Sequence, residues 1–539
     1  MSAMVYELPM ATARLMPQQE ALKSGSVSCS YGALAARIEA FADGLAAAGL
    51  VRQGRVAVYA DKSIDLVAAM FGAACAGGVM VPVNPLLKPE QVGYILRDCN
   101  VAVLVTTAPR LASLAQVLPA CTDLQHVVLV GPKIASPDVS VPVQEFESFI
   151  SPPAGGRARH RVIDSDMAAI LYTSGSTGSP KGVVLSHRNM VAGAKSVASY
   201  LENTAADRIL AVLPLSFDYG LSQLTTGFLA GATIVLHNHL LAADTVRVLA
   251  RERITGLAAV PPLWLQLAGV SWPETIDGHL RYFTNSGGAM PTATLRALRQ
   301  RMPSARPFLM YGLTEAFRST FLAPEEIDRR PTSMGKAIPN AEILVLRHDG
   351  SPCLPDEPGE LVHRGALVAL GYWNDPLRTA ERFRPLPARE PGIVLPELAV
   401  WSGDTVKVDA DGFLYFVGRR DEMIKSSGYR ISPTEVEEAV YRTGMVAEAA
   451  ALGIAHPALG QAVVLVAQPA EGFRADSDVL LGACRDLLPA FMLPTHVDWL
   501  DEPLPRNANG KIDRKRLAEQ LAHLFDAHPD SATTAGSSQ

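Results

Sequence analysis

The stretch Tyr-Thr-Ser-Gly-Ser-Thr-Gly-Ser-Pro-Lys-Gly, from Tyr172 to Gly182, decides the fold of this chain. It places hydroxyl side chains, glycines and one lysine between two apolar runs that are predicted strands. Glycines let backbone N–H groups face an anion closely, while hydroxyls and a lysine add donors and charge. The sequence therefore predicts a phosphate-binding loop. It differs from a Walker loop, because Pro180 precedes Lys181 and a strand, not a helix, follows.

Size and composition set the broad class. With 539 residues the chain exceeds a single core, so at least two domains are expected. A net charge of −6 argues against a nucleic-acid binder, which would carry a basic patch or stripe. The 6 cysteines form no CxxC pair, which argues against a disulfide framework or a zinc site. We expect a cytoplasmic enzyme in a reducing compartment.

Two segments bear on membranes and secretion. Met1–Leu15 has no continuous apolar core, so no secretory signal is expected. Leu66–Leu87 carries no charge and is long enough to suggest a membrane span, but Gly77-Gly78 interrupts it. We interpret it as a buried helix, about Ile64–Ala76, followed by a core strand, Val79–Val83. The sequence predicts a soluble protein without a membrane span.

Apolar periodicity outlines the domains. Alternating helical and short apolar stretches up to about Val270 predict a large α/β domain with layered, mainly parallel sheets. Short strands broken by turns predict a small β-barrel-like subdomain at about 341–419. Ser432-Pro-Thr-Glu435 is a strong helix start in a small α+β unit over 420–527. The first domain is thus expected at 1–419, and the tail 528–539 is predicted to be disordered.

The predicted elements fall into a set of helices and a set of strands. Helices are expected over 31–48, 187–200, 243–252, 432–441, 477–488 and from 513 onward. Strands are expected over 56–59, 102–106, 126–130, 209–213, 233–236, 343–346, 359–362, 406–408, 413–417, 450–454 and 462–467.

The glycine-rich stretch resembles the nucleotide loop of the adenylate-forming superfamily, which includes acyl-CoA synthetases, peptide-synthetase adenylation domains and luciferases. Further blocks follow in the family's order up to Arg514, so the resemblance covers essentially the whole chain. It implies ATP and Mg²⁺ as cofactors and CoA or phosphopantetheine as the acceptor thiol. It also implies nucleotide contacts from Thr173, Ser174, Gly175, Ser176, Thr177, Gly178 and Lys181.

A second block, Tyr-Gly-Leu-Thr-Glu at 311–315, also matches the family. The resemblance implies that Tyr311 stacks on adenine, that Thr314 binds the α-phosphate and that Glu315 helps hold Mg²⁺. An oxygen ligand suits that ion. Upstream, the turn containing Gly288 is suited to packing against the base.

A third block, Trp-Ser-Gly-Asp at 401–404, is followed by a strand that ends on an arginine. The resemblance implies that Asp404 accepts the ribose hydroxyls and that Arg419 is a second ribose or phosphate contact. The chain departs from the family at Trp401-Ser402, where Tyr/Phe-x-Thr is commoner. We expect this departure to change packing more than chemistry.

The resemblance also implies a small mobile C-terminal domain that rotates between two half-reactions. Asp421 matches the hinge residue of the family. Gly428, in the loop after it, matches a position that lines the pantetheine tunnel. Lys511, in Asn-Gly-Lys-Ile-Asp-Arg, matches the catalytic cation between the substrate carboxylate and the α-phosphate.

The block nearest the substrate, Pro214–Leu221, leaves two alternatives open. Asp218 resembles the aspartate that binds the α-ammonium in amino-acid adenylation domains, but Asp-Tyr-Gly-Leu is also similar to fatty acyl-AMP ligases. A buried carboxylate needs a cationic partner, which is either a substrate amine or a protein side chain such as Arg318. Arg318 could equally recognise a second substrate carboxylate. The positions carried over as pocket-lining are Tyr219, Ser222, Thr284, Ser286, Met310, Arg318 and Ser319.

Together these features predict an ATP-dependent acid–thiol ligase. It would activate a carboxylic acid as an acyl-adenylate, release pyrophosphate, and pass the acyl group to CoA or to a carrier protein acting in trans. The alternative is a stand-alone amino-acid adenylating enzyme that loads a carrier protein. The strings at 216–221 and 311–320 are similar to a bacterial subgroup of acyl-CoA ligases associated with exosortase gene clusters.

Overall fold

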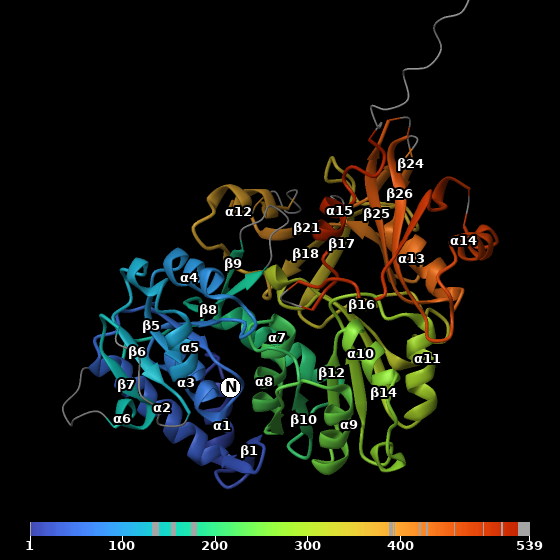
Figure 1. The fold of residues 1–539 in the computed structure, drawn as a ribbon. Helices are drawn as coiled ribbons and strands as arrows, with labels where there is room; N and C mark the ends of the chain where they lie inside the picture. The colour runs from blue at the N-terminus through green and yellow to red at the C-terminus, as the bar shows by residue number, and fades with distance from the viewer. Residues whose placement is uncertain are drawn as a thin grey trace, which may run out of the picture. The chain divides into compact units, whose positions relative to one another are not determined.

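The computed structural model describes residues 2–131, 139–151, 158–173, 180–386, 392, 394–419, 422–426, 429–457, 459–488, 490–507 and 510–526. The chain divides into two compact units. The first is Met1–Ser402 with Val408–Tyr415, and the second is Gly403–Lys407 with Phe416–Gln539. Figure 1 shows the elements of both units. The boundary predicted at 419/420 stays a prediction.

Within the described part of the first unit, one sheet has nine strands, which are β1 (Glu20–Ser24), β2 (Val27–Ser30), β10 (Arg208–Ala211), β11 (Thr233–Leu236), β12 (Gly256–Ala259), β13 (Tyr282–Asn285), β14 (Arg306–Tyr311), β15 (Thr320–Leu322) and β16 (Lys336–Ala337). Their order is β16-β15-β14-β13-β12-β10-β11-β1-β2. The pairs from β14 to β1 are parallel, whereas the outer pairs are antiparallel.

A second sheet, of eight strands among the described residues, consists of β3 (Arg55–Tyr59), β4 (Val79–Pro82), β5 (Val101–Thr106), β6 (His126–Leu129), β7 (Val143–Glu145), β8 (Met167–Thr173), β9 (Lys181–Ser186) and β19 (Gly371–Tyr372). Their order is β19-β9-β8-β4-β3-β5-β6-β7. The hairpin β8/β9 and the pair β9/β19 are antiparallel, and the remaining pairs are parallel.

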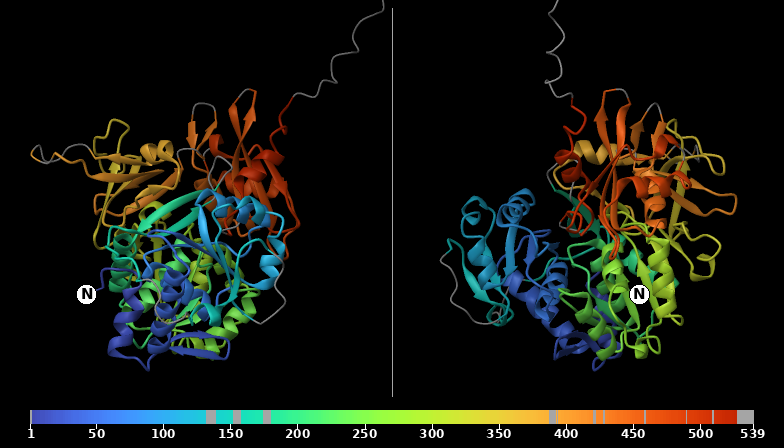
Figure 2. Two further views of the ribbon diagram at one scale, coloured as in Figure 1. Left: turned by 90° about the vertical axis from the view of Figure 1, so that its left-hand side faces the viewer. Right: turned by 45° about the vertical axis from the view of Figure 1, so that its right-hand side comes forward.

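Four helices fill the layer between these two sheets, namely α2 (Tyr31–Ala47), α3 (Ile64–Cys75), α7 (His187–Leu201) and α8 (Asp218–Ala230). They share one apolar core with strands of both sheets. Serine side chains cap the first three helices, each accepting a backbone N–H in the first turn. Figure 2 shows the two sheet bodies, blue to cyan and green, from two further directions.

The other helices of the first unit are α1 (Glu7–Leu15), α4 (Pro89–Asp98), α5 (Ala108–Ser113), α6 (Phe146–Phe149), α9 (Ala242–Arg251), α10 (Pro261–Ala268), α11 (Thr292–Arg301) and α12 (Pro376–Arg382). Short 3₁₀ turns are η1 (Leu118–Ala120), η2 (Glu274–Ile276), η3 (Thr314–Ala316) and η4 (Pro324–Glu326).

The predicted β subdomain is a separate sheet, whose described strands are β17 (Ala341–Leu346), β18 (Gly359–Gly365), β20 (Phe383–Pro385), β21 (Leu398–Val408) and β22 (Leu414–Arg419). The chain passes from one compact unit to the other within β21 and β22. The Trp401–Asp404 block lies inside β21 and is therefore extended.

The second unit contains a mixed sheet of described strands, β23 (Ile424–Ser426), β24 (Tyr429–Ile431), β25 (Val446–His456), β26 (Gly460–Pro469) and β27 (His496–Trp499). Its helices and short turn are α13 (Pro433–Arg442), α14 (Ser477–Arg485), α15 (Arg514–Gln520) and η5 (Ala490–Met492). α13 begins as predicted, because Ser432 accepts the Glu435 N–H and Pro433 occupies the first turn.

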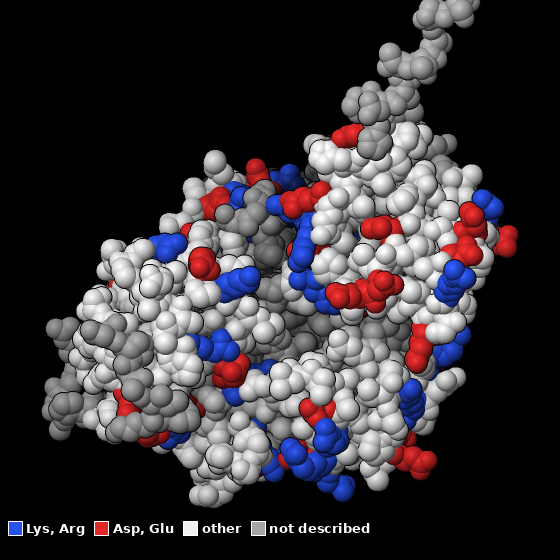
Figure 3. All heavy atoms as spheres, viewed as in Figure 1, with Lys and Arg blue, Asp and Glu red and all other residues white. Residues whose placement is uncertain are grey.

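The predicted fold class is confirmed: a large α/β domain carries a small β subdomain, and a smaller α+β unit follows. The uncharged stretch at 66–87 forms α3 and β4 as expected. Among the described residues no helix is both long and apolar enough to cross a membrane. On the face shown in Figure 3, acidic and basic side chains are interspersed, in keeping with a net charge of −6.

Candidate active site

Three side chains from distant parts of the first unit meet beside the glycine-rich stretch. The Lys181 Nζ lies 3.2 Å from Glu315 Oε1 and donates to the Tyr372 hydroxyl at 2.9 Å. The Tyr372 hydroxyl in turn donates to Glu315 Oε1 at 2.5 Å. The ammonium also lies 4.4 Å from the centre of the Tyr372 ring. We call Lys181, Glu315 and Tyr372 the lysine–glutamate cluster.

Electrostatics keep this carboxylate ionised. Burial by itself would raise the pKa of Glu315, but Lys181 and the Tyr372 hydroxyl outweigh it, so the pKa lies below its ordinary value. Burial and the neighbouring Glu315 carboxylate raise the pKa of Tyr372 far above its ordinary value. The tyrosine therefore stays a neutral hydrogen-bond donor.

Strand pairing explains the cluster. Lys181 begins β9, opposite Thr173 at the end of β8, so the two residues stand at the base of the glycine-rich loop. Tyr372 lies on β19, which pairs with β9. Ser174–Gly178 lie outside the described residues. Sequence reasoning did not find Tyr372; the available signal was an aromatic residue directly after Gly371.

The remaining nucleotide-site predictions for this unit follow β13 and β14. Tyr311 ends β14, and Thr314 and Glu315 lie in η3, which begins three residues after it. Thr314 is buried. Gly288 lies in the turn after β13, where its carbonyl accepts from the Asn285 amide at 2.9 Å. The carboxyl ends of two neighbouring parallel strands therefore present these residues.

A buried ion pair joins two of the predicted substrate residues. Arg318 Nη1 donates to Asp218 Oδ2 at 2.8 Å, and the two side chains are 1% and 5% exposed. The guanidinium also lies 4.7 Å from the centre of the Tyr219 ring. Of the two roles left open for Arg318, the structure therefore shows pairing with Asp218.

A strained turn places Arg318. Phe317 has φ of +56°, and the Arg318 N–H donates to the Ala316 carbonyl at 2.6 Å across it. This three-residue turn is rare and strained for a bulky residue. The Phe317 ring is accommodated because Gly193 lacks a side chain: a Cβ there would lie 2.4 Å from Phe317 Cδ1. One short loop thus presents Glu315 to Lys181 and Arg318 to Asp218.

Helix α8 carries the other half of the pair. Asp218 stands in its first turn, where the helix dipole favours negative charge. The Asp-Tyr-Gly-Leu pattern has a steric reason, because a Cβ on Gly220 would lie 2.0 Å from the Pro214 carbonyl oxygen. Only glycine allows the preceding loop to fold back onto this turn.

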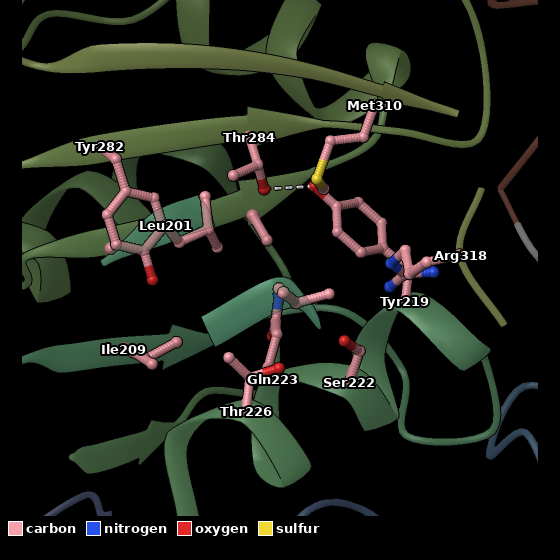
Figure 4. Close-up of a pocket in the computed structure, with 13 residues that line it drawn as sticks. Leu201, Ile209, Tyr219, Ser222, Gln223, Thr226, Tyr282, Thr284, Met310 and Arg318 are labelled. Atoms are coloured by element: carbon pink, nitrogen blue, oxygen red, sulfur yellow. Dashed lines mark hydrogen bonds between the residues drawn. The ribbon is translucent and has the colours of Figure 1, made fainter. Parts of the chain in front are cut away.

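Helices α7 and α8 and the nine-stranded sheet line a cavity of about 30 Å³. Figure 4 shows Tyr219, Ser222, Gln223 and Thr226 of α8 facing strands β10 and β13 across it. The Tyr219 and Thr284 hydroxyls are hydrogen-bonded across the space. The described lining residues, all of them buried, are Val197, Leu201, Ile209, Tyr219, Ser222, Gln223, Thr226, Gly256, Ala258, Tyr282, Thr284, Met310 and Arg318.

The cavity contains five of the seven positions expected to line the acid pocket, namely Tyr219, Ser222, Thr284, Met310 and Arg318. The other two, Ser286 and Ser319, are buried but do not line it. Sequence reasoning missed Gln223 and Thr226. Their signal was helical spacing, because both fall on the same face of α8 as Tyr219.

In the second unit, Asp404 and Arg419 form an ion pair of 3.5 Å across the paired strands β21 and β22. Asp404 is 6% exposed. The N–H of the exposed Lys511 donates to Asn507 Oδ1 at 3.1 Å. The predicted hinge Asp421 and the predicted tunnel residue Gly428 lie outside the described residues.

Two family models match the chain. The model described as AMP-binding enzyme matches residues 10–373, and the model described as AMP-binding enzyme C-terminal domain matches residues 435–511. The chain belongs to the AMP-binding enzyme family. The predicted membership of the adenylate-forming superfamily is confirmed.

Named relatives of this AMP-binding enzyme fall into two groups. The first are single enzymes: an L-proline–[L-prolyl-carrier protein] ligase of Pseudomonas fluorescens, 32% identical over 96% of the chain and 99% of the relative, and an indoleacetate–CoA ligase of Aromatoleum aromaticum, 30% identical over 95% and 96%. The second are large synthases, of which the chain spans only a small part. Tyrocidine synthase 3 of Brevibacillus parabrevis is 31% identical over 93% of the chain, which spans 7% of that relative's length.

A solved structure agrees on the fold. The o-succinylbenzoate CoA synthetase of Bacillus subtilis, in complex with its acyl-adenylate intermediate, superposes with a TM-score of 0.80 at 26% identity. The superposition covers 95% of this chain and 97% of that one. The resemblance to the exosortase-associated subgroup stays a prediction.

Proposed function

We propose that this protein is an AMP-forming ligase that joins an amine-free carboxylic acid to a thiol, that of CoA or of carrier-bound phosphopantetheine. The acid carboxylate attacks the α-phosphorus of ATP and expels pyrophosphate, and the thiol then displaces AMP from the acyl-adenylate. The lysine–glutamate cluster at the base of the glycine-rich loop is the observation that carries the proposal.

The nucleotide roles follow from charge. In this proposal Lys181 and the loop Thr173–Gly178 bind the β- and γ-phosphates, and Thr314 donates to the α-phosphate. Tyr311 and Gly288 contact adenine. In the second unit, Asp404 accepts the ribose hydroxyls beside Arg419. Positioning and neutralising charge are the main tasks in phosphoryl chemistry, and these side chains supply both.

Glu315 suits a magnesium ion, because its lowered pKa keeps it ionised at neutral pH and Mg²⁺ takes one or two carboxylates together with phosphate oxygens. Among the described residues no group of three or more His, Cys, Asp or Glu side chains could hold a metal by itself. When bound, the ion would neutralise charge on the phosphates. Releasing Lys181 from Glu315 would then free the ammonium for a phosphate.

The buried ion pair supports an amine-free acid over the amino-acid alternative. Asp218 would have to attract the substrate ammonium if the protein read amino acids. Its carboxylate already faces Arg318 at 2.8 Å in a buried setting. An arriving ammonium would have to displace a guanidinium whose removal leaves a buried charge without compensation.

The second unit would supply the remaining groups of the proposal. Lys511 provides the cation between the acid carboxylate and the α-phosphate. Asp421 is the pivot between the two half-reactions, and Gly428 lines the path of the thiol. Asp218, Tyr219, Ser286 and Arg318 form the acid pocket.

The test is acid-dependent exchange of labelled pyrophosphate into ATP with the full-length chain, across amine-free acids and amino acids. We expect exchange with amine-free acids only. Lys181→Met and Glu315→Gln should each lower it about 100-fold or more, since each removes a charge that acts on the transition state. Lys511→Ala should abolish AMP formation while ATP binding persists.

Matched controls are Lys195→Met and Glu325→Gln, which change exposed residues of the same types. Both should keep full exchange. Exchange driven by amino acids and lost in Asp218→Ala would overturn the choice of substrate, and unchanged turnover in Lys181→Met would contradict the proposed role of the cluster.

A further inference from the structure

Helix α8 is buried on all sides from Asp218 to Phe228, yet it is not apolar on all sides. Leu221, Leu224 and Phe228 recur at helical spacing and belong to the apolar core shared with α3. At 100° per residue, the face that carries Tyr219, Gln223 and Thr226 lies opposite them. A buried helix with one polar face calls for a polar occupant on that side, because unpaired polar groups are costly to bury.

The polar groups on this face have hydrogen-bonding capacity to spare. Within the described residues, neither the amide nitrogen nor the amide oxygen of Gln223 has a hydrogen-bond partner, and the same holds for the Thr226 hydroxyl. Gln223 and Thr226 are 5% and 3% exposed. Both line the cavity behind Tyr219.

Arg318 adds two further donors at the same cavity. Its Nη1 serves Asp218 and the Phe317 carbonyl, but among the described groups its Nε and Nη2 have no partner. The cavity of about 30 Å³ accommodates roughly two atoms the size of water. It therefore suits a small group that both donates and accepts hydrogen bonds.

The charges around the cavity further restrict which chemical groups it can accept. Asp218 and Arg318 form a pair of zero net charge, so the cavity offers no excess of either sign to an ammonium or to a second carboxylate. Bringing a charged tail into this space would require the pair to open or a net charge to be buried. A hydroxyl or carboxamide meets the amide, the hydroxyl and the free N–H groups without that cost.

We propose that Gln223 and Thr226 are specificity-determining residues that select an acid whose acyl chain ends in an uncharged hydrogen-bonding group, a hydroxyl or a carboxamide. This inference rests on the proposed function, because it names the substrate class of the same acid site. The acid's carboxylate is activated at the phosphate end, and its polar tail enters the cavity behind Tyr219.

The experiment uses pyrophosphate exchange by the full-length chain with matched straight-chain acids of about four to eight carbons. Within each pair, a terminal hydroxyl or carboxamide replaces the terminal methyl. We expect the polar member to have a kcat/KM about 10- to 100-fold higher than the methyl-ended member. The methyl group cannot hydrogen-bond, so it leaves the buried polar groups of the cavity unpaired. Dicarboxylic acids and ω-amino acids of the same length should be poor substrates.

Gln223→Leu should abolish or invert this preference by raising kcat/KM for the methyl-ended acid, and Thr226→Val should shift it in the same direction by less. Gln300→Leu, at an exposed glutamine, is the matched control and should keep the wild-type ratio. As a second readout, Tm shifts of the wild-type protein with a non-hydrolysable ATP analogue should be larger for the polar member.

The outcomes separate the two proposals. Equal kcat/KM within the pairs, or a ratio unchanged by Gln223→Leu, overturns the polar-tail inference and leaves the ligase proposal intact. Absence of exchange with every acid contradicts the proposed function, and the inference falls with it.

Discussion

Helices α3 and α8 are neighbours in the layer between the two sheets, and they pack through Phe71 and Phe228, whose ring centres are 5.1 Å apart. Both are buried for three turns. Leu66–Cys75 of α3 contains only apolar residues and glycine, whereas α8 adds a charged residue, a glutamine and three hydroxyl side chains of Ser and Thr.

The difference in composition between α3 and α8 indicates that α3 has a structural role and that α8 also has a functional one. An apolar buried helix needs only shape complementarity, because it leaves no polar group to satisfy. The polar face of α8 costs free energy unless a partner arrives, so it is expected where the protein binds something. We therefore interpret the side of α8 that faces α3 as core, and the opposite side as a binding surface.

The largest effect should come from placing a polar group on the wrong face of α8. Leu224→Gln exchanges a fully buried leucine for an amide with no partner in the apolar core shared with α3. We expect a loss of about 3–5 kcal/mol in the free energy of unfolding, from lost apolar burial and an unsatisfied amide. Urea unfolding measures it. A loss below about 1 kcal/mol would show that the two faces do not differ.

The ion pair at the start of α8 should rank next. Arg318→Met leaves Asp218 buried without its guanidinium, which we expect to cost about 2–4 kcal/mol of unfolding free energy, since the dipole of α8 offsets part of the loss. The double variant with Asp218→Asn should recover part of the stability. If the single and double variants unfold at the same urea concentration, the two charges are not coupled.

A smaller effect than those two is expected in α3, where the contribution of one thiol to the free energy of unfolding depends on pH. In its buried stretch, which is described throughout, Cys75 is the one titratable side chain, and burial raises its pKa from 9.0 to about 11. A raised pKa means that this contribution to stability is complete below pH 9 and is lost as the pH rises through about 11.

Cys75→Ala should therefore flatten part of the alkaline loss of stability, by about 1–2 kcal/mol near the upper end of that range. Unfolding curves at several alkaline pH values, compared with a Cys353→Ala control at a partly exposed thiol, measure the difference. Parallel pH profiles of wild type and Cys75→Ala would contradict it.

The smallest expected effect is an increase in the free energy of unfolding. Gln223→Leu removes an amide that has no partner among the described residues and fills similar volume with apolar atoms. We expect the free energy of unfolding to rise by about 1 kcal/mol while the polar acid becomes a poorer substrate, as is common where a site trades stability for function. A lower Tm for Gln223→Leu would indicate that the amide has a structural partner.

Local patterns are enough to predict much of the fold. α3, α7 and α13 begin where serine caps and apolar periodicity place them. Strand ends are less certain, because tertiary pairing sets them: the pattern predicts a strand over Ile209–Leu213, but the structure ends β10 at Ala211. Trp401–Asp404 lies within the long strand β21, whereas the predicted strand starts only at Val406.

The candidate site likewise contains residues that local sequence patterns identify and residues that only tertiary structure brings in. The family motifs identify Lys181 and Glu315, but the third member of their cluster, Tyr372, joins them only through the pairing of β19 with β9. Asp218 needs a cationic partner on physical grounds. Which one it has depends on a strained turn at Phe317 that sequence patterns do not predict.

By itself, the sequence determined the family, through motif residues that match it, and the α/β architecture, because apolar periodicity is a local property of the chain. Only the tertiary structure decided that Arg318 neutralises Asp218 and that Gln223 and Thr226 line a small cavity. Partners that lie far apart in the chain are chosen by packing, and the burial that makes a polar group costly exists only once the chain has folded.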